Sequence, residues 1–407
     1  MKILVVNCGS SSIKYQLLEM ATEEVLAQGL LERVGLPEGI LTHKQGKEQK
    51  QVRRAVRNHE AGMQLIVETL TSGPDSPIRN VAEISAVGHR VVHGGEDFVQ
   101  SVLVTDPVIR VIERNQDLAP LHNPPNLTGL RAAMKLLPGV PNVAVFDTAF
   151  HQTVPEHAYT YALPHEFYTK HRIRRYGFHG TSHRYVALQA AKLLGKPPQK
   201  ANLITVHLGN GCSMTAVREG KSVDTSMGMT PLEGLVMGTR SGDIDPAIPF
   251  FLASKLGVDL TAIDGTLNKK SGLLGVSGVS SDMREIIAAA DQGNARATLA
   301  LRIFAYRVKK YIGAYAAALG QLDAVVFTGG IGENCVPVRA MSCENLGTLG
   351  IEIDQEKNRS VAGTDADIST ASSRVRVLVV RTNEELMIAR DTRAVVEGGL
   401  EARRAGT

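Results

Sequence analysis

The sequence predicts an α/β protein built from two similar domains that face each other across a nucleotide. Two segments, 200 residues apart, share one design: an apolar strand runs into a tight turn of small residues, and a second strand follows. These segments are residues 2–18 and 201–217, where Asn7 aligns with His207 and Gly9 aligns with Gly209. Such turns expose backbone N–H groups that can hold an anion. Neither turn is a Walker loop, because no helix follows it and it contains no G-K-[ST].

Composition limits the class of protein. A chain of 407 residues is long enough for two or three domains, each with its own core. The 45 basic and 41 acidic residues nearly balance, which argues against nucleic acid or a membrane surface as a partner. No run of about 20 apolar residues predicts a membrane span. The strand at the N-terminus is unlike a signal peptide, and the four cysteines lack metal-site spacing, so we expect a cytoplasmic protein.

The first part of the chain alternates strands and helices. We expect a β-hairpin over residues 1–20, followed by a polar loop. The remaining elements expected here are the loop Pro37–Gln51, a helix over about Arg54–Leu70, a strand over Ile84–Val92, a helix over Asn126–Leu137 and a strand over Val143–Phe146. A stretch rich in His, Tyr and Pro then runs to Tyr176 and is expected to cross between domains.

The second part repeats this alternation, which is typical of the α/β class. Ser182 is expected to cap a helix that runs to Leu194, before the second hairpin. Later elements are helices over Asp282–Gly293 and Ala295–Leu319, strands over Ala324–Phe327 and Arg374–Val380, a last helix from Glu384 to about Val396, and a loose tail over Glu401–Thr407. In the helix Ala295–Leu319, the core-facing stripe is expected to contain Leu299, Ile303, Val308, Ile312 and Tyr315.

Four predicted strands end in polar residues. These ends are Asn7, Asp147, Thr328–Gly330 and Asn383–Glu384. Ligands of open α/β sheets collect at the carboxyl ends of strands, so the pattern favours a site for phosphate and Mg²⁺. Asp147 and Glu384 supply the oxygen ligands that Mg²⁺ prefers. The alternative is structural: Asp147 caps the next turn, and Glu384 begins a helix where acidic residues are favoured.

Two arginines and one histidine stand among small residues. Arg90 and Arg240 have glycine neighbours that allow a ligand to approach closely, and guanidinium groups bind carboxylate or phosphoryl oxygens. The alternative is that each arginine braces a loop. Among seven clustered histidines, His179 precedes a helix N-terminus, which favours negative charge nearby. A zinc site is a weak alternative, because His179 and His183 lack the glutamate of H-E-x-x-H.

Read together, these segments resemble the acetate kinase family from Ile3 to about Val396. Residues 6–14 and 224–246 resemble its two signatures, and residues 146–151, 174–183, 329–334 and 382–385 support the match. Met229 departs from the phenylalanine expected at that position, which is a conservative exchange.

The resemblance implies the duplicated, actin-like ATPase fold shared with sugar kinases and heat-shock chaperone ATPases. It implies an acyl-substrate domain formed by residues 1–150 plus about 385–407, and a nucleotide-binding domain over about 151–384. It further implies a homodimer and the reversible reaction of ATP with acetate, which gives ADP and acetyl phosphate. Mg²⁺ is the implied cofactor, and Mn²⁺ can substitute.

The resemblance also assigns roles to residues. The catalytic group is Asp147, Arg90, Arg240 and His179; the substrate group is Arg90, Val92, Leu121, His122, Phe178 and Pro231; Asn7 and Glu384 serve the metal. The nucleotide group is Ser10, Ser12, Lys14, His207, Leu208, Gly209, Asn210, Gly211, Asp282, Met283, Arg284, Gly330, Ile331, Gly332, Glu333 and Asn334.

Acetate chemistry adds two expectations. A carboxylic acid with a pKa of about 4.3 is already ionised at neutral pH, so Asp147 has little proton to remove and is expected mainly to position Mg²⁺. Extra methylenes in an apolar pocket change binding by only about 1–3 kcal/mol, so acetate should be best, propionate tolerated and longer acids poor. The rival readings are a propionate or butyrate kinase, an actin-like or chaperone-like ATPase, a sugar kinase and a non-catalytic relative.

Overall fold

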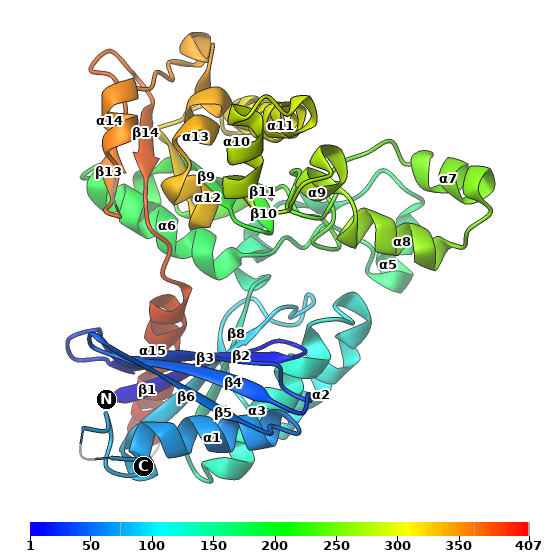
Figure 1. The fold of residues 1–407 in the computed structure, drawn as a ribbon. Coiled ribbons are helices and arrows are strands. Elements are labelled where there is room, and N and C mark those ends of the chain that lie inside the picture. Colours follow the sequence, from blue (N-terminus) through cyan, green and yellow to red (C-terminus); the bar gives the residue numbers. More distant parts are fainter. Residues whose placement is uncertain (74, 362, 406–407) are drawn as a thin grey trace. The chain divides into compact units, whose positions relative to one another are not determined.

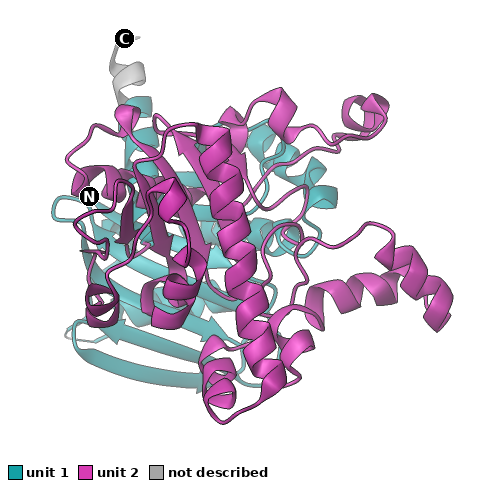
Figure 2. Ribbon diagram, turned by 90° about the horizontal axis from the view of Figure 1, so that it is seen from above, with its two compact units in different colours: residues 1–149, 383–407 teal, residues 150–382 magenta. Residues whose placement is uncertain are grey.

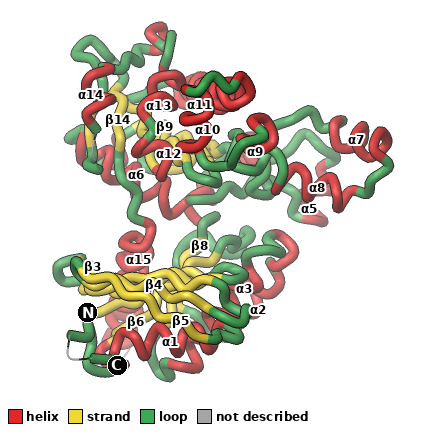
Figure 3. Tube along the Cα trace, in the orientation of Figure 1, coloured by secondary structure: helices red, strands yellow, loops and turns green. Residues whose placement is uncertain are grey.

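A computed structural model describes residues 1–73, 75–361 and 363–405, which divide into two compact units (Figure 2). Unit 1 comprises Met1–Ala149 and Asn383–Thr407, and unit 2 comprises Phe150–Thr382. Helices and strands alternate in both units, which confirms the α/β class (Figure 3). Among the described residues, none of the helices is both long and apolar enough to span a membrane.

Unit 1 is built on an eight-stranded sheet of order β5-β4-β3-β2-β1-β6-β8-β7 (Figure 1). The strands are β1 (Lys2–Cys8), β2 (Ser12–Glu19), β3 (Glu24–Glu32), β4 (Gly39–Gln45), β5 (Glu48–Arg54), β6 (Ile84–Val91), β7 (Val102–Leu103) and β8 (Asn142–Phe146). Its helices are α1 (His59–Thr71), α2 (Asp106–Arg114), α3 (Asn123–Leu136) and α15 (Glu384–Ala405). Strands β1, β6 and β8 run parallel, so their carboxyl ends lie at one edge.

Unit 2 is built on a six-stranded sheet of order β11-β10-β9-β12-β14-β13. The strands are β9 (Asn202–Leu208), β10 (Cys212–Arg218), β11 (Lys221–Thr225), β12 (Ala324–Thr328), β13 (Ala366–Asp367) and β14 (Arg376–Val379). Its helices are α4 (Glu156–Tyr159), α5 (His165–His171), α6 (Gly180–Leu193), α7 (Ile248–Leu256), α8 (Leu260–Lys269), α9 (Gly272–Ser277), α10 (Met283–Asp291), α11 (Ala295–Leu319), α12 (Gly329–Asn334), α13 (Val336–Cys343) and α14 (Gln355–Ser360).

The two sheets share a five-stranded core of the same order and direction. In unit 1 the core is β3-β2-β1-β6-β8, and in unit 2 it is β11-β10-β9-β12-β14. In each core the first three strands form an antiparallel meander, and the last two run parallel to the central strand, which is β1 in unit 1 and β9 in unit 2. The repeat seen in the sequence is therefore a repeat of the fold, and the duplicated α/β architecture is confirmed.

Alternation along the central strands of unit 1 explains which helices cover which face. Successive side chains of a strand point to opposite faces. Leu4 and Val6 of β1 pack in a core cluster with residues of α1 and α3. Gly88 of β6 faces α15 instead: a Cβ at Gly88 would lie 2.4 Å from Thr392 Oγ1. The last helix of the chain thus completes unit 1, which explains why both segments belong to one unit.

Several boundaries differ from the prediction. Pro37–Gln51 is not a loop, because β4 and most of β5 lie within it; β5 is an exposed polar edge strand without apolar alternation. Helix α1 begins at His59, where Asn58 accepts a hydrogen bond from the N–H of Ala61. Helix α3 begins at Asn123 and includes two prolines in its first turn, where a missing N–H costs nothing.

Three further expectations were wrong in part. The N-cap of α6 is His179, and Ser182 lies inside the helix, where its hydroxyl bonds to other side chains. In α11, Leu299 is 51% exposed and Ile303 is only half-buried; Ala300 and Phe304 share the core with Val308, Ile312 and Tyr315. The expected loose tail is helical to Ala405, and residues 406–407 lie outside the described residues.

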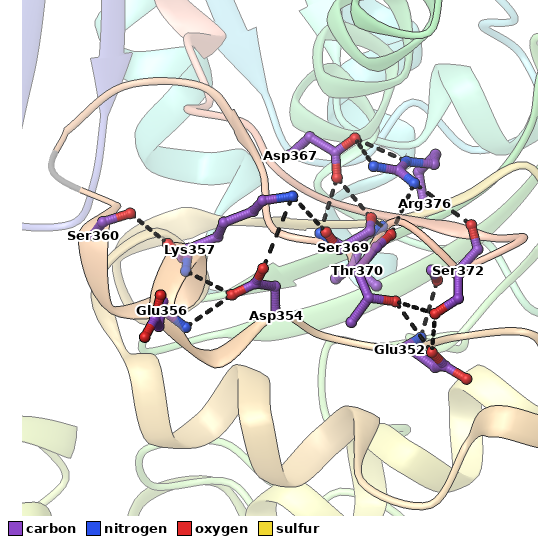
Figure 4. A network of polar contacts seen from close by, with 12 residues as sticks. Glu352, Asp354, Glu356, Lys357, Ser360, Asp367, Ser369, Thr370, Ser372 and Arg376 are labelled. Carbon is purple, nitrogen blue, oxygen red and sulfur yellow. Dashed lines mark hydrogen bonds and ion pairs between the residues drawn. The ribbon is translucent and has the colours of Figure 1, made fainter.

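A surface network joins the segment before β14 to α14 (Figure 4). Asp354 caps α14 by accepting from the N–H groups of Glu356 and Lys357. Asp367 accepts from the guanidinium of Arg376 on β14. These acidic side chains are thus occupied by structural partners, and they brace the strand that leads to Thr382 at the end of unit 2.

Candidate active site

Arg90 and Asp147 form an ion pair at the carboxyl ends of β6 and β8 in unit 1. Arg90 donates from Nε and Nη2 to the two carboxylate oxygens of Asp147 at 3.0, 3.2 and 2.5 Å. Asp147 is buried, at 1% exposure. Burial lowers the pKa of Arg90, but the charge and hydrogen bonds of Asp147 raise it by a larger amount, so the net shift is upward. Asp147 therefore fixes this guanidinium as a cation of defined orientation, and among the described residues no hydrogen bond occupies Nη1.

Carboxylates gather beside this pair. Burial raises the pKa of Glu384 to about 7; Arg90 lowers it, and the neighbouring carboxylates of Asp147 and Glu385 raise it. Lys14 forms an ion pair with Glu385. Among the described residues, no group of three His, Cys, Asp or Glu side chains has the geometry of a metal cage. The carboxylates of Asp147 and Glu384, with an amide at Asn7, nevertheless suit Mg²⁺, which keeps several waters.

The first turns of α3 hold the backbone around Arg90, which the sequence did not indicate. The amide of Asn126 accepts from Val92 N–H at 3.0 Å and donates to Cys8 C=O at 2.7 Å. Asn123 accepts from His93 N–H at 3.0 Å and donates to its C=O at 2.9 Å. Asn126 thus joins the ends of β1 and β6, and both asparagines satisfy backbone groups beyond the ladder.

The residues expected to line the acyl pocket come from both units. In unit 1, Val92 is buried at 5% exposure, His122 is the N-cap residue of α3, and Leu121 is 68% exposed. In unit 2, Phe178 is buried at 2% exposure and Pro231 is half-buried. Their shared role stays a prediction.

His179 of unit 2 lies at a strained position. Its φ of +56° places it in the left-handed region, immediately before α6. Its Nδ1 contacts Ser213 Oγ at 2.8 Å, and its ring stacks on His207 with centroids 4.5 Å apart. A non-glycine residue in this conformation costs about 1–3 kcal/mol and is common at functional sites. The surrounding contacts therefore hold His179 where local preference would not.

His207 is the penultimate residue of β9, as Asn7 is of β1. Its Nδ1 contacts Ser182 Oγ at 2.8 Å, and the same hydroxyl contacts Thr382 Oγ1 at 2.7 Å. Ser182 was predicted to cap a helix. Its hydroxyl instead links His207, just before the Gly209–Gly211 turn, to Thr382 at the end of unit 2. No sequence signal marked that contact, since Ser182 and Thr382 are 200 residues apart.

Arg240 lies at the second small-residue turn. A Cβ on Gly211 would lie 3.5 Å from Arg240 Nη1 and 3.6 Å from His179 Nε2, so both groups converge on this turn. Nη1 also contacts Pro231 C=O at 3.4 Å. Burial lowers the pKa of Arg240, although Cys212 opposes the shift. Within the part of the chain that the structure describes, Arg240 has no ion pair, which favours binding of an external anion.

A pocket of about 760 Å³ adjoins the same turn in unit 2, a size typical of small-molecule sites. Eight predicted nucleotide residues line it: Gly209, Asn210, Asp282, Met283, Arg284, Gly330, Ile331 and Asn334. The sequence did not indicate five other lining residues: Ser281, Ile287, Cys335, Val336 and Pro337.

Other predicted nucleotide residues lie elsewhere. Ser10, Ser12 and Lys14 belong to the β1–β2 hairpin of unit 1. His207, Leu208, Gly211, Gly332 and Glu333 are not among the lining residues of the pocket. Glu333 accepts from the N–H groups of Gly329 at 3.0 Å and Thr382 at 3.1 Å. Its carboxylate thus braces the start of α12.

Comparison with known proteins agrees with this arrangement. Residues 2–390 match the acetokinase family. The chain is 57% identical over 400 residues to the acetate kinase of Caldanaerobacter subterraneus, covering 98% of this chain and 100% of that protein. It is 57% identical over 399 residues to the acetate kinase of Thermotoga maritima, covering 98% and 99%.

Solved structures give the same result. The acetate kinase of Porphyromonas gingivalis is 51% identical, with a TM-score of 0.94 over 97% of this chain and 99% of that one. A propionate kinase of Francisella tularensis is 45% identical, with a TM-score of 0.89 over 97% and 99%. Both the sequence family and the fold therefore extend over almost the entire chain, and the chain belongs to the acetokinase family.

Proposed function

We propose that this chain transfers the terminal phosphoryl group of ATP to acetate directly and reversibly, giving acetyl phosphate and ADP. The observation that carries the proposal is the convergence of Arg240 and His179 at the Gly211 turn, next to a pocket lined by Gly209 and Asn210. A desolvated guanidinium and an imidazole at this point suit a transferring phosphoryl group. Full-length relatives named acetate kinase support acetate as the acceptor.

Phosphoryl transfer requires alignment and charge stabilisation more than covalent chemistry. Arg240 and His179 hold the equatorial oxygens, and each such donor is worth about 3–4 kcal/mol in a dry site. Arg90 binds the acetate carboxylate with the guanidinium edge that Asp147 leaves open. Acetate is ionised at neutral pH, so these residues orient the nucleophile and need not deprotonate it.

The remaining residues hold ATP and the metal. Asn7 and Glu384 would hold Mg²⁺ with its waters, and the ion would supply charge neutralisation on the phosphates. Ser10, Ser12 and Lys14 serve the terminal phosphates, and His207–Gly211 hold the phosphate chain. Residues 282–284 and 330–334 flank the adenosine; among them, Glu333 acts by bracing the start of α12. Mn²⁺ is expected to replace Mg²⁺.

A propionate kinase is the second candidate, because a solved propionate kinase is 45% identical over almost the whole chain. The test is hydroxylamine trapping with ATP and Mg²⁺ and, separately, acetate, propionate, butyrate, glycerol and glucose. Acetyl hydroxamate as the strongest product supports the proposal. Propionyl or butyryl hydroxamate as the strongest product would change the substrate and keep the chemistry, whereas ADP release without hydroxamate would support an ATPase.

We further propose a cytoplasmic homodimer. Four free cysteines, all buried, fit a reducing compartment. Helices α7 and α8 extend from the body of unit 2 in both views (Figures 1 and 2). Helix α7 exposes Phe250, Phe251 and Leu256 at 68%, 65% and 63%. Apolar side chains so exposed favour a protein partner, for which a second copy of the chain is the simplest candidate.

A further inference from the structure

Beneath the phosphoryl-binding turn, a chain of buried hydrogen bonds ends at His179. Thr205 Oγ1 contacts His183 Nδ1 at 2.7 Å, and His183 Nε2 contacts Ser213 Oγ at 2.7 Å. Ser213 Oγ then contacts His179 Nδ1 at 2.8 Å. Thr205, His183 and Ser213 are all fully buried. The three are therefore placed to decide which ring nitrogen of His179 carries a proton, because the bond at one nitrogen fixes the state of the other.

The proton of Ser213 has two choices. A hydroxyl has one proton, so Ser213 donates to one imidazole and accepts from the other. His183 is neutral, because burial lowers its pKa well below the ordinary value, and His151 and His207 nearby lower it further. A neutral His183 donates from one nitrogen and accepts at the other. The donor and acceptor roles in all three hydrogen bonds therefore depend on whether Thr205 donates to His183 or accepts from it.

Distances decide the direction at Thr205. Its hydroxyl could donate to Thr215 C=O, but that oxygen is 3.4 Å away, beyond the usual 2.5–3.0 Å of an O–H···O bond. The nitrogen of His183 is 2.7 Å away, so it is the nearer acceptor for the single proton of Thr205. Thr205 thus donates to His183 Nδ1, His183 Nε2–H donates to Ser213, and Ser213 donates to His179 Nδ1.

We propose that the chain Thr205–His183–Ser213 holds His179 in the tautomer whose proton lies on Nε2. This nitrogen is the one that converges with Arg240 on the Gly211 turn. Neutral His179 then donates a hydrogen bond to the phosphoryl group without being protonated first. Ser213 is a positioning residue in this account, and its role rests on the proposed phosphoryl transfer, whereas the tautomer itself does not.

The primary test is the tautomer of the ligand-free protein at pH 8, where an imidazole with the usual pKa of about 6.5 is neutral. Long-range ¹H–¹⁵N correlation spectra of histidine-labelled protein report which nitrogen is protonated, and the signal lost in His179→Gln identifies the residue. We expect Nε2–H in the wild type. A proton on Nδ1 of His179 would overturn the proposal, even if acetyl phosphate is formed.

The second test compares Ser213→Ala with Ser222→Ala. Ser222 is also fully buried and contacts another imidazole, His151 Nδ1, at 2.9 Å, but it is not part of the hydrogen-bond series from Thr205 to His179. Ser213→Ala should give mixed tautomers and lower kcat by about 10- to 100-fold, as loss of an imidazole's orienting partner commonly does. The KM values for ATP and acetate should change less than kcat.

The outcomes of the two tests are distinct. Ser213→Thr, which keeps the hydroxyl, should recover both the tautomer and kcat, and Ser222→Ala should retain the wild-type values of each. Equal kcat and equal spectra for Ser213→Ala and the wild type would overturn the proposal. If the wild type shows Nε2–H but forms no acyl phosphate from any carboxylic acid, the proposed function fails and the tautomer assignment stands.

Discussion

Charges at the carboxyl ends of β6 and β8 depend on one another. Asp147 holds Arg90; burial raises the pKa of Glu384, Arg90 lowers it and Asp147 raises it further. The sequence motivated a metal-positioning role for Asp147, which stays a prediction. The structure adds a second role, because a guanidinium that loses the carboxylate to which it is hydrogen-bonded keeps neither its orientation nor its full charge compensation. The two roles respond differently to Mg²⁺, so they can be separated.

Asp147→Asn is expected to lower kcat by about 100-fold or more, because Arg90 loses the charged partner that orients it. Raising Mg²⁺ should restore only part of this loss, since no metal concentration repairs the Arg90 contact. Steady-state kinetics across a Mg²⁺ titration measure the effect. Glu68→Gln, which removes the exposed Arg54–Glu68 pair, should leave kcat unchanged. Full recovery of Asp147→Asn at high Mg²⁺ would contradict the role of Asp147 in orienting Arg90.

His89 makes stability depend on pH. It is buried and contacts Asn142 Oδ1 at 2.7 Å, and burial lowers its pKa from 6.5 to about 4 although that contact opposes the shift. The folded state therefore rejects a proton that the unfolded state accepts, so this contribution is complete above pH 6.5 and is lost as the pH falls towards 4. From pH 7.5 to pH 5 the loss is about 2 kcal/mol.

Urea unfolding of His89→Gln at both pH values checks this. The wild type should lose about 2 kcal/mol more than the variant between pH 7.5 and 5. Equal losses in the two proteins would show that His89 is not the group responsible.

At the scale of elements, the turn between β12 and α12 places one wall of the pocket in unit 2. Gly329 begins α12 with φ +76°, and a Cβ there would lie 2.7 Å from Leu208 C=O. Only glycine allows α12 to start this close to the end of β9. The pocket wall formed by Gly330, Ile331 and Asn334 depends on that start.

Gly329→Ala should lower the free energy of unfolding by about 1–3 kcal/mol, because the new side chain meets both an unfavourable φ and a backbone oxygen. Gly313→Ala in α11 is the matched control, since no heavy atom lies within 4 Å of its Cβ; it should stabilise by about 0.4–1 kcal/mol. Denaturant unfolding measures both. A Gly329→Ala variant as stable as the wild type would refute the steric argument.

Sequence patterns predicted the elements whose signal is local. The strands β1, β8 and β12 were found because their apolar runs are continuous and end in small or polar residues. The edge strand β5 was missed because exposed strands need no apolar alternation. Contacts such as Asn126–Cys8 and Ser182–Thr382 join distant parts of the chain, and no local signal encodes them.

On the scale of the whole molecule, duplication divides the chemistry between two related units. Each has a hairpin turn at the end of its first strand, with Asn7 and Gly9 in unit 1 and His207 and Gly209 in unit 2. The arginines are divided too: Arg90 is anchored by Asp147, and Arg240 has no ion pair among the described residues. Equivalent strands and turns therefore carry different side chains in the two units.

The proposed dimer predicts a particle of twice the chain mass of 43.7 kDa in light scattering. Replacing Phe250 and Phe251 together by serine should shift the mass towards that of one chain, because their apolar area would no longer be buried. Val99→Ser, at a 64% exposed position of unit 1, is the control and should leave the mass unchanged. A wild-type particle of one chain would contradict the dimer.

The most direct test of the proposed phosphoryl transfer detects its phosphorus-containing products. ³¹P NMR of the purified protein with ATP, Mg²⁺ and acetate should show acetyl phosphate and ADP appearing in equal amounts, with no ADP formed when acetate is omitted. Added ADP and acetyl phosphate should run the reaction backwards to ATP. ADP and inorganic phosphate formed at the same rate without any carboxylic acid would contradict the central claim and identify the protein as an ATPase.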